Sequence, residues 1–156
     1  MQSRYLLALL PLLACDSGSD VEPRSGTWTY GGSEVVSNTC GADPLTDPAG
    51  PFTLNVSGDG KFTVVDEAFD GSFECTFSDG SYACPSRVAS EIVLDGVSAT
   101  VKLNASISGT LESATELSGT QDVDVACEGE SCAILASMYS LTLPCAYSYT
   151  FSATAK

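Results

Sequence analysis

The stretch VSATVKLNASIS, residues 97–108, decides the fold, because apolar and polar residues alternate along its whole length. A period of two places successive side chains on opposite faces of a β-strand, so one face is expected to be buried and the other to face water. The apolar positions are Val97, Ala99, Val101, Leu103, Ala105 and Ile107. The same alternation occurs at Phe52, Leu54 and Val56, at Val88, Ser90, Ile92 and Leu94, and at Tyr147, Tyr149 and Phe151.

Turn signals divide the rest of the chain into further strands. Asp59-Gly60 and Asp79-Gly80 favour tight hairpin turns, and Gly31-Gly32 indicates a bulge or bend. We expect strands near residues 26–36, 51–57, 61–68, 71–78, 86–95, 97–108, 115–126 and 143–155, and a short helix over 132–140. Short connections favour an antiparallel meander, and closure removes its two edges. The sequence therefore predicts an all-β fold, a single eight-stranded antiparallel up-and-down barrel.

Six cysteines beyond the first are expected to stabilise this barrel as disulfides, for which fifteen pairings exist. Cys127 and Cys132 enclose only four residues, and Cys75 and Cys84 flank the Asp79-Gly80 turn. Cys40 is then left to pair with Cys145, between the first and last strand regions. The alternative, Cys127 and Cys132 as a redox or metal pair, lacks a second thiol pair of matching spacing.

Charge and composition exclude several classes of function. The chain carries 6 basic and 20 acidic residues, a net charge of −14, which repels nucleic acid. It has no histidine, the commonest general base and zinc ligand. We therefore expect a protein that is not an enzyme, with no cofactor and no nucleic-acid partner.

The first residues indicate export. Arg4 precedes the apolar run 5–13, which is too short to span a membrane and is typical of a cleaved secretory signal. The tetrapeptide Leu12-Leu13-Ala14-Cys15 resembles the lipobox of bacterial lipoproteins. This resemblance implies a lipidated Cys15, cleavage before it, and stable membrane anchoring by acyl chains. The domains expected are then a signal peptide over 1–14, a lipidated cysteine and flexible tether over 15–25, and the barrel over 26–156.

Candidate binding residues are few. Gly26-Thr27-Trp28 resembles the G-x-W motif of the lipocalins, eight-stranded barrels that bind small molecules, and this resemblance makes Trp28 and Tyr30 candidate ligand contacts. Asp122 and Asp124 share a strand face and are weak candidate ligands of a divalent cation, with a solvated outer face as the default interpretation. The run 55–66 departs from a calcium loop at its first and twelfth positions and is better explained by a hairpin turn.

The sequence thus predicts a lipid-anchored lipoprotein of the bacterial cell envelope, facing the periplasm or the cell surface. Its barrel is expected to bind a small apolar ligand. The alternative is a structural or protein-interaction module, or an inhibitor of an exported hydrolase that acts through its loops. The barrel interior separates these hypotheses. An interior filled by Trp28, Phe52, Phe62, Phe73 and Tyr149 favours the interaction class, whereas a cavity favours a ligand.

Overall fold

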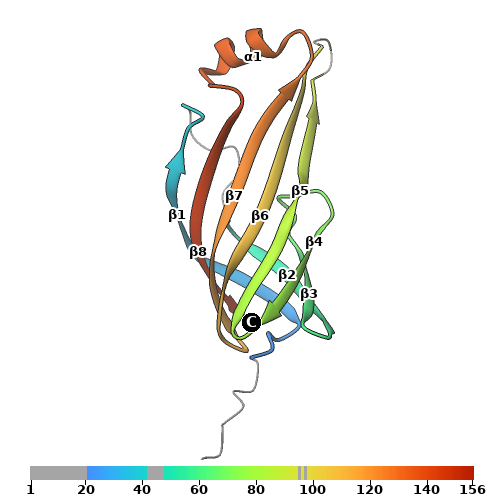
Figure 1. Ribbon diagram of the computed structural model, residues 1–156, viewed down its shortest axis with the longest axis vertical. Helices are drawn as coiled ribbons and strands as arrows, with labels where there is room; N and C mark the ends of the chain where they lie inside the picture. Colours follow the sequence, from blue (N-terminus) through green and yellow to red (C-terminus); the bar gives the residue numbers. More distant parts are fainter. Residues whose placement is uncertain (1–20, 42–47, 95, 97) are drawn as a thin grey trace, which may run out of the picture.

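The computed structural model describes residues 21–41, 48–94, 96 and 98–156. The elements, in chain order, are β1 (Gly26–Asn38), β2 (Pro51–Gly58), β3 (Lys61–Val65), β4 (Ser72–Ser78), β5 (Ser81–Val93), β6 (Thr100–Ser113), β7 (Glu116–Glu128), α1 (Cys132–Tyr139) and β8 (Cys145–Ala155). Each strand pairs antiparallel with the next, and β8 pairs back to β1, which closes the barrel (Figure 1). The predicted fold class is confirmed.

The predicted turns and bulge are present. Asp59 and Gly60, like Asp79 and Gly80, all have positive φ, the conformation that two-residue hairpin turns of this type require. The β1–β8 register shifts between Tyr30 and Gly32, at the predicted bulge. The cysteines form Cys40–Cys145, Cys75–Cys84 and Cys127–Cys132, the same three pairs that the sequence predicts.

The fifth strand differs from its prediction. β5 begins at Ser81 instead of residue 86, and it contains Pro85, which cannot donate a ladder hydrogen bond. The strand tolerates this proline because β4 pairs only with Ser81–Ala83, so Pro85 has no partner on that side. The predicted buried face was also wrong. The β5–β6 register shifts between Val88 and Ser90, so Ala89 is buried while Val88 and Ile92 are exposed.

The eight strands differ in length, and this divides the barrel into two halves (Figure 1). β2, β3 and β4 have 8, 5 and 7 residues, whereas β1, β5, β6, β7 and β8 have 11 to 14. β2 pairs only with Gly26–Thr29 of β1. We call the part where all eight strands pair the closed half. The open half consists of β1 from Gly32 to its end, β5 from Pro85 to its end, the parts of β6, β7 and β8 that lie between these two strand segments in the sheet, and α1.

Two glycines face each other across β6 and β7 in the closed half. Gly109 lies opposite Gly119 in the β6–β7 register, and Tyr82 of β5 covers both. The Tyr82 hydroxyl donates a hydrogen bond to the Ser118 carbonyl at 3.2 Å. A Cβ atom on Gly109 would overlap the Ser118 carbonyl oxygen of β7 and lie 2.7 Å from the Tyr82 hydroxyl, so a side chain there would clash with the β7 backbone as well as with the tyrosine.

The chain enters the barrel at the closed end. Pro23 is fully buried, Val21 packs against the core, and the Arg24 amide donates to the Ala114 carbonyl at 2.8 Å. Residues 21–25, the last part of the predicted tether, thus contact the barrel. The predicted signal peptide, the lipobox with Cys15 and the first part of the tether lie outside the described residues. Among the residues described, no helix is long and apolar enough to cross a membrane.

Candidate functional site

The barrel interior is filled by side chains. Trp28, Phe52, Phe62, Phe73 and Tyr149 are all buried, with at most 5% of their surface exposed. Between Tyr30, Phe62, Tyr82 and Phe151 lies a cavity of about 10 Å³. That volume holds about one water molecule, far below the roughly 300 Å³ of a small-molecule site.

The two predicted ligand contacts are engaged within the protein. Trp28 has no exposed surface, its ring lies 6.3 Å from that of Phe52, and its indole Nε1 donates to the Arg24 carbonyl at 2.8 Å. Tyr30 packs against Phe52 and Phe151, with ring centroids 4.6 and 5.4 Å away. Both side chains therefore serve the core.

A buried polar pair links β1 to the segment after β3. The Tyr30 hydroxyl donates to Asp66 Oδ2 at 3.1 Å, and Asp66 Oδ1 accepts the Ala68 amide at 2.9 Å. Burial raises the pKa of Tyr30 well above its ordinary value, and the negative charge of Asp66 raises it further. Burial also raises the pKa of Tyr82. Both tyrosines therefore stay neutral in the fold at pH values where an exposed tyrosine ionises.

This burial predicts a loss of stability in alkaline solution. Unfolding releases Tyr30 and Tyr82 to an ordinary pKa of about 10, so above that pH the unfolded chain holds fewer protons than the native one. The stabilisation is complete below pH 10 and is lost as the pH rises, by up to about 1.4 kcal/mol per pH unit for each tyrosine. Guanidinium unfolding from about pH 8 to about pH 12 measures this slope. Tyr30→Phe should reduce it, and an unchanged slope would contradict the assignment.

Gln121 is a buried polar residue that the sequence analysis missed. It is fully buried on β7, and neither its amide nitrogen nor its amide oxygen has a hydrogen-bond partner. A signal for it was present, because Leu117, Gln121 and Val123 share the inward phase of the alternation in β7. Because both amide atoms lack partners, Gln121 costs stability rather than adding to it.

The predicted cation ligands lie on the outer face of β7. Asp122 Oδ1 accepts the Ser148 hydroxyl at 2.6 Å, and the side chain of Asp124 is exposed. Within the described part of the chain, no three acidic or sulfur side chains gather closely enough to hold a metal ion. The geometry therefore adds no support for a cation site.

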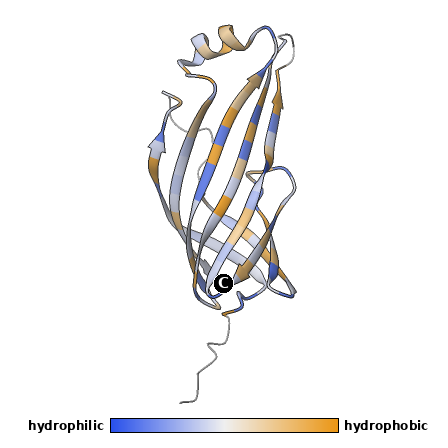
Figure 2. Ribbon diagram, in the orientation of Figure 1, coloured by the Kyte–Doolittle hydropathy of each residue, from blue (hydrophilic) through white to orange (hydrophobic). Residues whose placement is uncertain are grey.

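Exposed apolar side chains gather around the open half. Among the residues that the structure describes, nine large apolar residues have exposed side chains, and they lie on the open half or, for Val65, at its border. They are Val35 and Val36 on β1, Val65 on β3, Val88, Ile92 and Val93 on β5, and Ile134, Met138 and Tyr139 on α1. In Figure 2, α1 and the upper parts of β1 and β5 contain hydrophobic segments. The closed half carries no comparable group among the residues described. An apolar rim of this kind is typical of an interaction surface.

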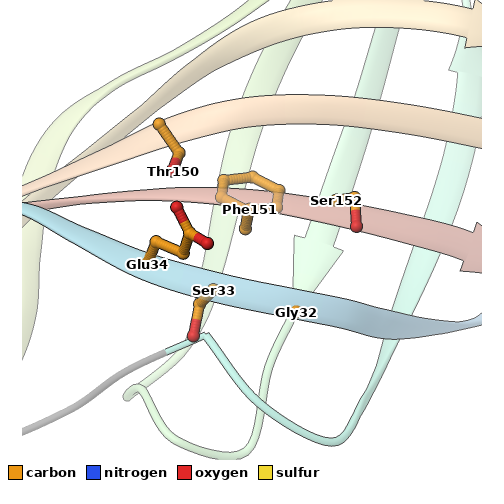
Figure 3. A pocket seen from close by; sticks show the side chains of 6 residues that line it. All are labelled: Gly32, Ser33, Glu34, Thr150, Phe151 and Ser152. Carbon is orange, nitrogen blue, oxygen red and sulfur yellow. The ribbon is translucent and has the colours of Figure 1, made fainter.

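Two surface hollows lie in this half. One, of about 350 Å³, follows the β1–β8 junction beside the bulge, between Gly32–Glu34 and Thr150–Ser152 (Figure 3). Glu34 and Thr150, which are register partners, point toward each other in it. The other, of about 460 Å³, lies under α1 and is lined by Cys127, Ala136 and Leu143, among others.

The charge around this surface is one-sided. β1, β7 and β8 together contain five acidic residues and no basic residue. They are Glu34, Asp122, Asp124 and Glu128 in the open half and Glu116 in the closed half. Lys102 of β6 bonds to Glu128 at 2.7 Å, and this is the one salt bridge among the described residues. The open half thus combines exposed apolar side chains with a negative field.

The fold and the site define a closed eight-stranded antiparallel barrel with three disulfides, a filled interior and an apolar, acidic open end. Disulfides persist in oxidising compartments, so three of them indicate an extracytoplasmic protein. Comparison of the chain with protein-family models, with curated protein sequences and with solved structures finds no match. The resemblances to lipoproteins and to lipocalins therefore stay predictions from the sequence.

Proposed function

We propose that this protein is a lipid-anchored interaction module of the bacterial envelope, which binds another protein through the open half of its barrel. The observation that carries the proposal is the contrast between the filled interior and the exposed apolar rim. A barrel with room for about one water molecule argues against a small apolar ligand inside it. An inhibitor of an exported hydrolase would be one form of such a module.

The position of the chain ends supports this proposal. Residues 21–25 contact the closed end, whereas α1 lies at the opposite end (Figure 1). An anchor on Cys15 would therefore hold the closed end towards the membrane and leave the open half facing away from it. The role proposed is not enzymatic, since the chain has no histidine to supply a general base.

Anchoring is tested by Cys15→Ser. The variant should leave the membrane fraction and lose the mass of its acyl chains, because the sulfur that carries the lipid is gone. Ser17→Ala, which keeps Cys15, is the matched control and should remain membrane-bound. Fractionation and intact-protein mass spectrometry provide the readout. Retention of Cys15→Ser in the membrane would contradict the anchor.

Partner binding is tested by photo-crosslinking in intact cells. A photoreactive residue replaces Val36, Ile92 or Met138 in the open half, and Glu74 or Glu116 in the closed half serves as the control position. We expect one identified protein to be crosslinked from all three open-half positions and from neither control. Crosslinks from the closed half alone, or an apolar molecule that copurifies at one per barrel in native mass spectra, would overturn the proposal.

A further inference from the structure

The upper part of β1 has one edge that pairs with none of the described residues. β2 pairs with β1 only as far as Thr29, whereas β8 pairs with β1 up to Asn38. Among the residues described, no strand and no backbone hydrogen bond occupies the second edge of Gly32–Ser37. These six residues extend over about 20 Å at about 3.3 Å each. Such an edge presents backbone N–H and C=O groups to any extended chain that approaches it.

We propose that this edge, Gly32–Ser37 of β1, adds a strand from the partner protein, an extended segment in which apolar and basic residues alternate. The inference rests on the proposed function and specifies how the partner is bound. In strand addition, backbone hydrogen bonds supply affinity and alternate side chains supply specificity.

β1 is better suited to this role than β5, the other strand that borders the opening. Pro85 removes a donor from the β5 edge, and the Asp70 amide already bonds to the Ala89 carbonyl at 2.7 Å. Arg87 of β5 also lies over the Phe73 ring at 4.1 Å, which ties that edge to β4. β1 contains neither proline nor a basic residue between Gly32 and Ser37.

The side chains of β1 indicate the chemistry of the added strand. Val35 and Val36 are 51% and 64% exposed, and a neighbouring strand would cover them. Glu34, the residue before Val35, lines the surface hollow of Figure 3, and Asp122 lies on the same sheet two strands away. Because β1, β7 and β8 carry no basic residue, the incoming segment must supply the positive charge.

The same charge argues against a second copy of this chain as the occupant. Each copy carries a net charge of −14, so pairing of β1 with β1 would place Glu34 and its acidic neighbours close to their counterparts. Like charges on adjacent strands are destabilising.

The test uses the full exported chain in detergent and a synthetic peptide, Lys-Val-Thr-Val-Lys-Val-Thr-Val-Lys. A second peptide with Glu in place of each Lys keeps the apolar pattern and reverses the charge. We expect the lysine peptide alone to bind, and amide hydrogen exchange of residues 32–37 to slow at least about ten-fold in its presence. Val36→Lys should weaken its binding at least about ten-fold, because it adds a like charge at the edge. Thr76→Lys, at an exposed position on β4 in the closed half, is the matched control and should bind normally.

Several results would overturn the inference. They are equal binding of the two peptides, slowed exchange at β5 or α1 instead of β1, no binding at millimolar peptide, or a dimer through β1 in sedimentation experiments. A failure of the proposed function would be seen in a different experiment, the crosslinking described above. Crosslinks from Ile92 and Met138 without protection of β1 would preserve the interaction module and exclude strand addition, whereas no crosslink from any open-half position would overturn the module itself.

Discussion

Replacing both Cys40 and Cys145 by alanine should lower the free energy of unfolding by about 5 kcal/mol. The bond between them spans 105 residues, and the entropy removed from the unfolded chain grows with the length of the loop that is closed. Such a loss is comparable with the whole stability of a small domain, about 5 to 15 kcal/mol. Guanidinium unfolding under oxidising conditions measures it, with circular dichroism as the signal.

The matched control is the double alanine replacement of Cys127 and Cys132. Their bond spans 5 residues, so its removal should cost only about 2 kcal/mol by the same relation. The two variants remove the same chemical groups and differ in the loop that they open. If the two variants lost the same free energy of unfolding, the Cys40–Cys145 bond would not stabilise the protein through loop entropy.

Trp28→Ala should destabilise the protein by about 3 to 5 kcal/mol, the range found when large aromatic core residues are truncated. Trp28 has no exposed surface and occupies the closed end, where it stacks on Phe52 and bonds to the Arg24 carbonyl. The alanine would leave a cavity and an unpaired carbonyl. Thermal and guanidinium unfolding of the full chain measure the effect.

Tyr139→Ala is the control for this second experiment. Tyr139 is also aromatic but is 64% exposed on α1, so its loss should change stability by no more than about 0.5 kcal/mol. Trp28→Phe, which keeps an aromatic ring but is smaller and lacks the N–H donor, should lie between the two. A cost below about 1 kcal/mol for Trp28→Ala would mean that the closed end is not part of the cooperative core.

Much of the fold could be predicted because local signals and global fold agree. The alternation at 97–108 predicts β6 and its buried face, and the Asp-Gly pairs define two hairpins. The disulfide pairs follow from loop lengths and from barrel closure. The start of β5 was predicted wrongly because a proline such as Pro85 argues against a strand. The strand accommodates Pro85 because β4 is short and does not pair with it.

The candidate site could be predicted much less well. The exposure of Val35, Val36 and Ile92 depends on β2 and β4 ending before their neighbours, and no single strand carries that information in its own residues. Trp28 and Tyr30 are binding candidates in the sequence through the resemblance to the lipocalin G-x-W motif, and a sequence does not distinguish an aromatic residue that lines a cavity from one that fills it. The absence of histidine and the excess of acidic residues are evident from the sequence itself, and they limit the kinds of partner that the protein can bind.

The pairing of β1 with β8 also has a consequence for the order of events during export. The first strand finds its main partner only when the last strand has crossed the membrane, so a chain secreted from its amino terminus cannot close while translocation continues. Cys75–Cys84 and Cys127–Cys132 join neighbouring segments and can oxidise early, whereas Cys40 must wait for Cys145. Contacts this distant in sequence also slow folding. A newly secreted chain therefore passes through an interval in which β1 has not yet paired with β8.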